Sequence, residues 1–199
     1  MSAIAYPQLA RDERRRLGDL PLTLEWIGDE DGALRLLDQT RLPGEVVMID
    51  CRDVDAVWEA IRALRVRGAP AIGVAAAYGV YLGVRGARNA SIDEFDRQLA
   101  RTAKQLCDAR PTAVNLAWAV RRVSDAIGGG AGLPAERARR ALEVAHELAA
   151  EDADVCRRIG EAGAPLVPEG GGVLTHCNAG ALATAGSGTA LSVFYEAHR

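Results

Sequence analysis

The chain has 199 residues, and 49% of them are hydrophobic, so it can bury a sizeable core as one large domain or two small ones. Its formal net charge of -3 argues against nucleic acid or an anionic membrane as a partner. The apolar run at 70–84 is shorter than the roughly 20 residues that span a bilayer, and residues 1–20 do not read as a secretory signal, which predicts a cytoplasmic protein.

Residues 22–51 alternate apolar with polar side chains, a pattern typical of β-strands. The alternation is broken at Asp31-Gly32 and at Pro43-Gly44, which predicts two or three antiparallel strands in a small sheet. Residues 53–66 then carry apolar side chains at helical spacing, and a second helix is predicted to open at Pro70. Because the second helix is apolar on every side, we expect it at the centre of its domain.

Further helices are predicted between residues 91 and 163. Ser91, with Glu94 three residues later, forms a capping box for the first of them. Thr112 is expected to cap the next helix, and Pro134 to open a long one that keeps an apolar period to about Gly160. Residues 1–163 are therefore predicted to form one α+β domain, in which a small antiparallel sheet accompanies a helical bundle.

Residues 164–199 follow a different pattern. A Pro/Gly-rich hinge leads to VLTHC at 173–177, read as a short buried strand, then to a loop of small residues at 178–188, here called the small-residue loop, and to a helix from Thr189. Strand, glycine-rich loop and helix predict the start of an α/β, Rossmann-like domain at 164–199. One parallel strand alone lacks backbone partners, so either another chain completes the sheet or, as we favour, the sequence stops early in its second domain.

Cys177 stands at the carboxyl end of the predicted strand, which is the edge where open α/β sheets bind their ligands. A helix N-terminus near Thr189 would lower the pKa of a neighbouring thiol and so favours a reactive cysteine, but a small inert packing residue is an equal alternative. His176 should point to the opposite strand face and is predicted to be packed. The other three cysteines are read as packing residues, and the wide spacing of all four predicts neither a disulfide framework nor a metal site.

Two arginines precede predicted helix N-termini, where free backbone N–H groups also bind anions. Arg67 lies in VRGAPAIG and Arg110 opens RPTAVNL, so the two can share one phosphate site. Each arginine has an alternative, which is an ion pair with a nearby carboxylate. The glycines of the small-residue loop likewise fit either anion binding or close packing, because the loop matches neither GxGxxG nor GxxxxGKS.

Five segments together resemble the methylthioribose-1-phosphate isomerases, which share a superfamily with the regulatory subunits of initiation factor 2B. In the family's order they are LLDQTRLPGE, AIRALRVRGAPAIGVAAAYG, RPTAVNLAWA, EDADVCRRIGEAG and LTHCNAGALATAGSGTAL. The resemblance implies conversion of 5-methylthioribose 1-phosphate to 5-methylthioribulose 1-phosphate in methionine salvage, by a homodimer that uses no metal or organic cofactor. It also implies that Cys177 is catalytic and that Arg67, Gly68, Ala69 and Arg110 bind the substrate.

The family's catalytic acid, an aspartate of its α/β domain, has no matching motif in these 199 residues. We therefore expect the chain to be inactive as an isomerase on its own. Two other functions stay open: isomerisation of a related sugar phosphate, either ribose 1,5-bisphosphate or 5-deoxyribose 1-phosphate, and a non-catalytic role like that of the initiation factor 2B subunits. Cys177 within THCNAG favours an enzyme, because the regulatory relatives lack this cysteine.

Overall fold

The structure is a computed structural model of the chain, and it describes residues 22–129 and 132–198. Residues 1–21, in which we expected no secretory signal, lie outside the described residues. In chain order the elements are β1 (Leu24–Ile27), β2 (Ala33–Leu37), β3 (Met48–Cys51), α2 (Val54–Arg62), α3 (Ala69–Val84), η1 (Arg85–Ala87), α4 (Ile92–Ala109), α5 (Val114–Ile127), α6 (Pro134–Gly163), η2 (Ala164–Leu166), η3 (Ala181–Ala183) and α7 (Ala190–Ala197). None of the helices in these two ranges is long and apolar enough to cross a membrane.

The N-terminal strands form the predicted small antiparallel sheet, in the order β1-β2-β3. Leu34 and Leu36 on one face of the central strand are fully buried. Arg35 on the opposite face forms an ion pair with Asp50 of β3, with Nε and Oδ1 at 2.7 Å. Both sides of this pattern fix the register, because a slip by one residue would turn Leu34 and Leu36 away from the core and separate Arg35 from Asp50.

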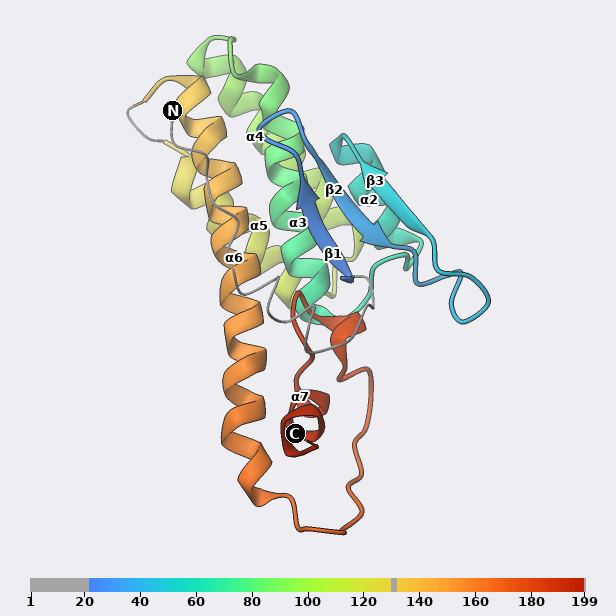
Figure 1. The fold of residues 1–199 in the computed structure, drawn as a ribbon. Coiled ribbons are helices and arrows are strands. Elements are labelled where there is room, and N and C mark those ends of the chain that lie inside the picture. The colour runs from blue at the N-terminus through green and yellow to red at the C-terminus, as the bar shows by residue number, and fades with distance from the viewer. Residues whose placement is uncertain (1–21, 130–131, 199) are drawn as a thin grey trace.

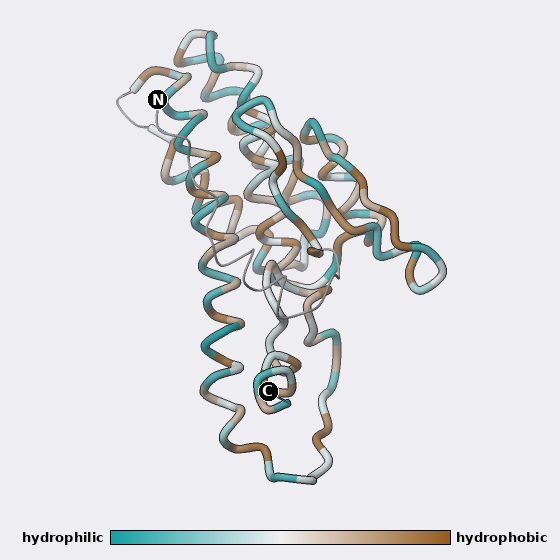
Figure 2. The backbone as a smooth tube through the Cα atoms, in the orientation of Figure 1, coloured by the Kyte–Doolittle hydropathy of each residue, from teal (hydrophilic) through white to brown (hydrophobic). Residues whose placement is uncertain are grey.

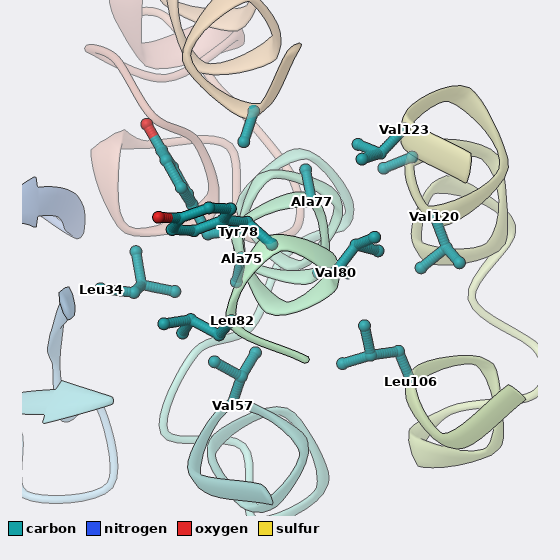
Figure 3. Packing of buried hydrophobic residues seen from close by; sticks show 14 of the residues in the cluster. Leu34, Val57, Ala75, Ala77, Tyr78, Val80, Leu82, Leu106, Val120 and Val123 are labelled. Atoms are coloured by element: carbon teal, nitrogen blue, oxygen red, sulfur yellow. The ribbon is translucent and has the colours of Figure 1, made fainter. Parts of the chain in front are cut away.

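Helix α3 lies at the centre of the domain, as its sequence predicts. The elements around it contribute Leu34 of the sheet, Val57 of α2, Leu106 of α4, and Val120 and Val123 of α5 (Figure 3). Small residues of α3 let these neighbours approach, since a Cβ atom at Gly79 would lie 3.0 Å from Leu106 and 3.1 Å from Val57. A helix enclosed in this way needs an apolar residue at nearly every position, which explains why it carries no polar stripe.

Two of the predicted helix boundaries hold and two differ. Ser91 caps α4 as predicted, because its Oγ accepts a hydrogen bond from the Glu94 N–H at 3.2 Å. The Glu94 carboxylate, predicted to complete a capping box, bonds to Arg97 and Arg101. The prediction that Thr112 caps α5 is wrong: Ala113 occupies the N-cap position and makes no side-chain capping bond. Helix α2 ends earlier than predicted, since Leu64 has a φ of +61°, which a right-handed helix excludes. Pro134 does open α6, as predicted.

Helix α6 extends beyond the rest of the bundle, and α7 lies beside its C-terminal half (Figure 1). Leu148 is still in the core, but Val155 and Ile159, which the periodic pattern placed in the buried stripe, are 40% and 37% exposed. In this half of α6 the buried residues are Ala153, Cys156 and Gly160. Further along, a Cβ atom at Gly160 would lie 2.9 Å from the Ser192 carbonyl oxygen, so the absence of a side chain lets α7 pack closely.

The segment 173–177, predicted to be a short buried strand, forms no strand in the structure. Leu174 is 96% exposed, and in Figure 2 the chain returning from the end of α6 is an extended segment with hydrophobic stretches. Within the described residues no other strand pairs with this segment, and an extended chain without partners leaves its backbone groups to water. The predicted helix after it is confirmed as α7, whereas the Rossmann-like domain stays a prediction.

Candidate functional site

The small-residue loop folds onto itself around Thr184, which is 1% exposed. The Thr184 Oγ1 atom accepts hydrogen bonds from the N–H groups of Gly186 and Gly188, at 3.2 and 3.1 Å, and donates to the Gly186 oxygen at 3.0 Å. Gly180 and Gly188 form an antiparallel bridge, and a Cβ atom at Gly188 would lie 2.5 Å from the Gly180 carbonyl carbon. These glycines therefore serve close packing within the loop.

Side chains next to the sheet hold this loop from one side. Thr23, just before β1, donates its hydroxyl hydrogen to the Ala181 carbonyl oxygen at 2.8 Å. Gln39, just after β2, donates from Nε2 to the Leu182 carbonyl oxygen at 2.7 Å. Both donors belong to buried residues, and a buried donor without an acceptor is costly, so the two bonds fix η3 against the sheet.

A third anchor comes from helix α6. The Asp152 Oδ2 atom accepts a hydrogen bond from the Ala185 N–H at 2.6 Å. Burial raises the pKa of Asp152, and the hydrogen bond from Ala185 opposes that rise. Within the part of the chain that the structure describes, no basic side chain pairs with this carboxylate, so a hydrogen bond to the backbone holds the loop here.

The RGA turn at 67–69 lies directly against the small-residue loop. Gly68 has a φ of +102°, and a Cβ atom there would lie 2.5 Å from the Cα of Ala183, so the position requires glycine. Arg67 is exposed, and its Nε donates to the Gln39 Oε1 at 3.4 Å. Ala69 begins α3 and is exposed. All three residues of the predicted substrate-binding turn therefore lie beside the loop.

Arg110 lies in the turn between α4 and α5 and is half-buried. Helix α5 begins beside the first turns of α3, since a Cβ atom at Gly73 would lie 3.2 Å from the Asn115 oxygen. The turns that carry Arg67 and Arg110 therefore lead into neighbouring helix N-termini at one end of the bundle. Across residues 22–129 and 132–198 neither arginine forms an ion pair, so the alternative of a nearby carboxylate partner fails there.

Cys177 immediately precedes the small-residue loop, with a φ of +70° and an exposed side chain. Cys51 and Cys156 are buried, and burial raises the pKa of the Cys51 thiol to about 12. Cys107 is half-buried, which leaves Cys177 as the accessible thiol of the four. Its catalytic role stays a prediction. The prediction that His176 is packed is wrong, because the strand face that would pack it does not form.

Elsewhere the described surface carries an open groove between α2 and α4. None of the predicted site residues lines it, and its lining consists of Asp55, Trp58, Glu59, Arg101, Lys104, Gln105 and Asp108. Within this lining Lys104 pairs with Asp108 at 2.5 Å, whereas Arg101 pairs with Glu94 and Glu59 with Arg65, both outside the groove. Among the described residues no group of three or more His, Cys, Asp or Glu side chains is arranged to hold a metal ion.

Sequence reasoning missed the three anchors, which are Thr23, Gln39 and Asp152. Gln39 and Asp152 lie in two of the segments that carry the family resemblance, and that is the one signal that pointed to them. Their roles depend on partners far along the chain: Gln39 bonds to Leu182, 143 residues later in the sequence, and Asp152 bonds to Ala185, 33 residues later. Local pattern does not show which polar side chain will find such a partner.

Comparisons with known proteins found a family and several relatives for this chain. A family model described as the initiation factor 2 subunit family matches residues 65–199. The methylthioribose-1-phosphate isomerase of Trichlorobacter lovleyi is 50% identical over 177 residues, which cover 88% of this chain and 50% of the relative. The 5-deoxyribose 1-phosphate isomerase of Moorella thermoacetica is 49% identical over 169 residues, which cover 83% of this chain and 47% of the relative.

A solved structure is also similar. The 5-methylthioribose 1-phosphate isomerase of Pyrococcus horikoshii matches with a TM-score of 0.85 and 36% sequence identity, over 95% of this chain and 52% of that one. This chain thus spans about half the length of the relatives that it matches. Because the family model covers well over half of it, the chain belongs to the initiation factor 2 subunit family.

Proposed function

We propose that this chain takes part in an aldose–ketose isomerase that converts 5-methylthioribose 1-phosphate to 5-methylthioribulose 1-phosphate. One observation carries the proposal: the RGA turn, with Arg67, packs against the loop that directly follows Cys177. These segments are more than 100 residues apart in sequence, and both belong to the motifs that resemble the isomerases. The names of the T. lovleyi and P. horikoshii relatives support the same substrate.

The chemistry assigns a task to each group. The sugar ring opens when its ring oxygen gains a proton while the phosphate stays on C1. The bond from C1 to the ring oxygen breaks, and the C2 hydrogen moves to C1 with its electron pair, as hydride. The C2 hydroxyl loses its proton to become the ketone, so C1 is reduced as C2 is oxidised and no external oxidant is needed. Arg67 and Arg110 hold the phosphate dianion, the N–H groups at Gly68 and Ala69 assist them, and Cys177 acts beside C1 and C2.

The acid that protonates the ring oxygen lies, in this proposal, on an α/β domain that follows residue 163. In this proposal a Rossmann-like domain also supplies sheet partners for residues 173–177, which pair with no strand among residues 22–129 and 132–198. Relatives about twice as long as this chain have room for such a domain. We place the complete enzyme in the cytoplasm as a homodimer that needs no metal or organic cofactor.

Two alternatives are supported by particular observations. The M. thermoacetica relative, almost as similar as the T. lovleyi one, is named for 5-deoxyribose 1-phosphate, which differs in the 5-substituent. The family model is named for an initiation factor subunit, which favours a non-catalytic role. The accessible thiol of Cys177, next to the small-residue loop, favours a catalytic role. Turnover of each of the two sugar phosphates separates these three possibilities.

The test is an isomerase assay on two proteins, residues 1–199 and a version that continues with the sequence downstream of Arg199. We expect turnover in the longer protein and a rate lower by at least about 10² to 10⁴ in the shorter one, which lacks the acid. Cys177→Ala in the longer protein should abolish turnover with little change in substrate affinity, whereas Cys107→Ala should not. Wild-type kcat in Cys177→Ala would refute the assignment, and equal activity in both proteins would place the acid within residues 1–199.

A further inference from the structure

Resting on the proposed function, we propose that Gln39 is a positioning residue for the isomerase site. Its side chain ties Arg67, which holds the substrate phosphate, to the small-residue loop that follows Cys177. The side-chain amide of Gln39 thereby fixes the position of Arg67 relative to the loop that follows Cys177.

Both ends of the Gln39 side-chain amide are engaged. Its Nε2 donates to the Leu182 carbonyl oxygen at 2.7 Å, and its Oε1 accepts from the Arg67 Nε at 3.4 Å. Only one orientation of the amide satisfies both partners, because a carbonyl oxygen needs a donor and a guanidinium needs an acceptor. The two contacts therefore support each other, and an amide side chain supplies both the donor and the acceptor from one carbon.

The amide is held rigidly enough to act as a spacer. Gln39 is 1% exposed, and its backbone N–H donates to the Arg65 carbonyl oxygen at 2.9 Å. The preceding residue, Asp38, pairs with Arg65, with Oδ2 and Nη1 at 2.6 Å. Residues 38 and 39 thus hold the segment 65–67 at several points, and the side chain of Gln39 extends from this base to the loop.

Positioning of this kind affects rate more than folding. An exposed arginine samples many rotamers, and a hydrogen bond to a buried amide limits that sampling before the substrate arrives. A displacement of about 1 Å at a reacting centre can cost about 10²-fold in rate. The alternative is that Gln39 merely satisfies a buried carbonyl, in which case its loss should weaken the whole fold and leave Arg67 unaffected.

The first measurement is hydrogen exchange of the loop amides 183–188 in residues 1–199. Gln39→Met removes both contacts at similar volume, and Gln39→Glu removes only the donor, so it serves if the Met variant fails to fold. Gln98→Met is the matched control, because Gln98 Nε2 also donates to a backbone carbonyl, that of Gly83 at 3.0 Å, away from the loop. We expect exchange about tenfold faster at 183–188 in both Gln39 variants and unchanged there in Gln98→Met. Wild-type exchange in the Gln39 variants, or equal acceleration in the control, overturns the proposal.

The second measurement tests the link to Arg67 in the longer, active protein. Gln39→Met should raise the KM for 5-methylthioribose 1-phosphate about fivefold in the wild-type background and have no effect on KM in an Arg67→Met background. The same rise in both backgrounds overturns the link to Arg67. A wild-type protein without turnover refutes the proposed function instead, and the exchange of residues 183–188 then decides alone whether Gln39 positions the loop.

Discussion

Replacement of Gly68 by alanine tests the contact on which the site depends. The added Cβ atom would lie 2.5 Å from both the Cα and the Cβ of Ala183 and 2.8 Å from its oxygen. All of these distances are well inside van der Waals contact, and two of the three atoms belong to the backbone. Relief therefore requires that the RGA turn and η3 move apart, which breaks the arrangement that places Arg67 beside the loop.

The magnitude follows from two separate costs. A non-glycine residue at a φ of +102° costs on the order of 1 to 3 kcal/mol in backbone strain. Forcing an extra methyl group into a packed contact costs about 1 to 3 kcal/mol more. The sum, about 2 to 6 kcal/mol, is a large part of the roughly 5 to 15 kcal/mol that stabilises a typical domain. The chain can limit this loss by releasing the loop, so the loop should loosen first.

Chemical denaturation of residues 1–199, with hydrogen exchange of the loop, measures both effects. Gly170→Ala is the control for backbone strain, since Gly170 has a φ of +69° with no atom within 4 Å of an added Cβ, and we expect a cost of about 1 kcal/mol. Gly86→Ala, with open space and no positive φ, should change stability by less than about 1 kcal/mol. A Gly68→Ala protein within about 0.5 kcal/mol of wild type, with unchanged loop exchange, would refute the reasoning.

Three further predictions concern the other site residues. In the longer protein Arg110→Ala should raise KM about tenfold or more, and Arg110→Lys should restore only part of the lost affinity, because a point charge does not reproduce a bidentate fork. Full restoration by lysine would show instead that Arg110 acts by simple charge attraction. Burial raises the pKa of Asp152 above its ordinary 3.8, so the folded state favours the protonated carboxyl. The stability of the wild-type protein relative to Asp152→Asn should therefore fall as pH rises from 3.8 through that raised pKa. Parallel curves of stability against pH for the two proteins would contradict this. A thiol reagent at neutral pH should label Cys177 well before Cys51, whose pKa is raised to about 12. Cys177→Ser should remove the fast phase of labelling, and a fast phase that persists in this variant would contradict the assignment of Cys177 as the accessible thiol.

Much of the fold could be predicted because its signals are local. Helix α3 is apolar on every side, and a helix of that kind has no place except the centre of a domain. Ser91 and Pro134 mark helix starts through contacts within one turn, and the breaks at Asp31-Gly32 and Pro43-Gly44 separate strands that pair with their sequence neighbours. Each of these features needs only a few adjacent residues to form.

The segment 173–177 could not be predicted in the same way. Its apolar residues read as a strand, but a strand is defined by partners, and none pairs with it among residues 22–129 and 132–198. The RGA motif made Arg67 and Gly68 candidate site residues, yet the sequence did not show that Gly68 lies against Ala183, which is 115 positions further along the chain. The anchoring role of Asp152 was hidden for the same reason, since α6 carries several acidic residues and only tertiary contact distinguishes this one.

The structure also decides between the two sequence-based interpretations of the loop glycines. A phosphate cradle needs backbone N–H groups that are free to point at the anion. The N–H groups of Gly186 and Gly188 both donate to the Thr184 Oγ1, and Gly180 packs against Gly188, so these glycines are occupied within the loop. In the proposed function, Arg67 and Arg110 hold the phosphate from the other side, at the entrances of α3 and α5. The small residues of the loop let the RGA turn pack closely against it. Arg67 thereby lies next to the loop that begins directly after Cys177.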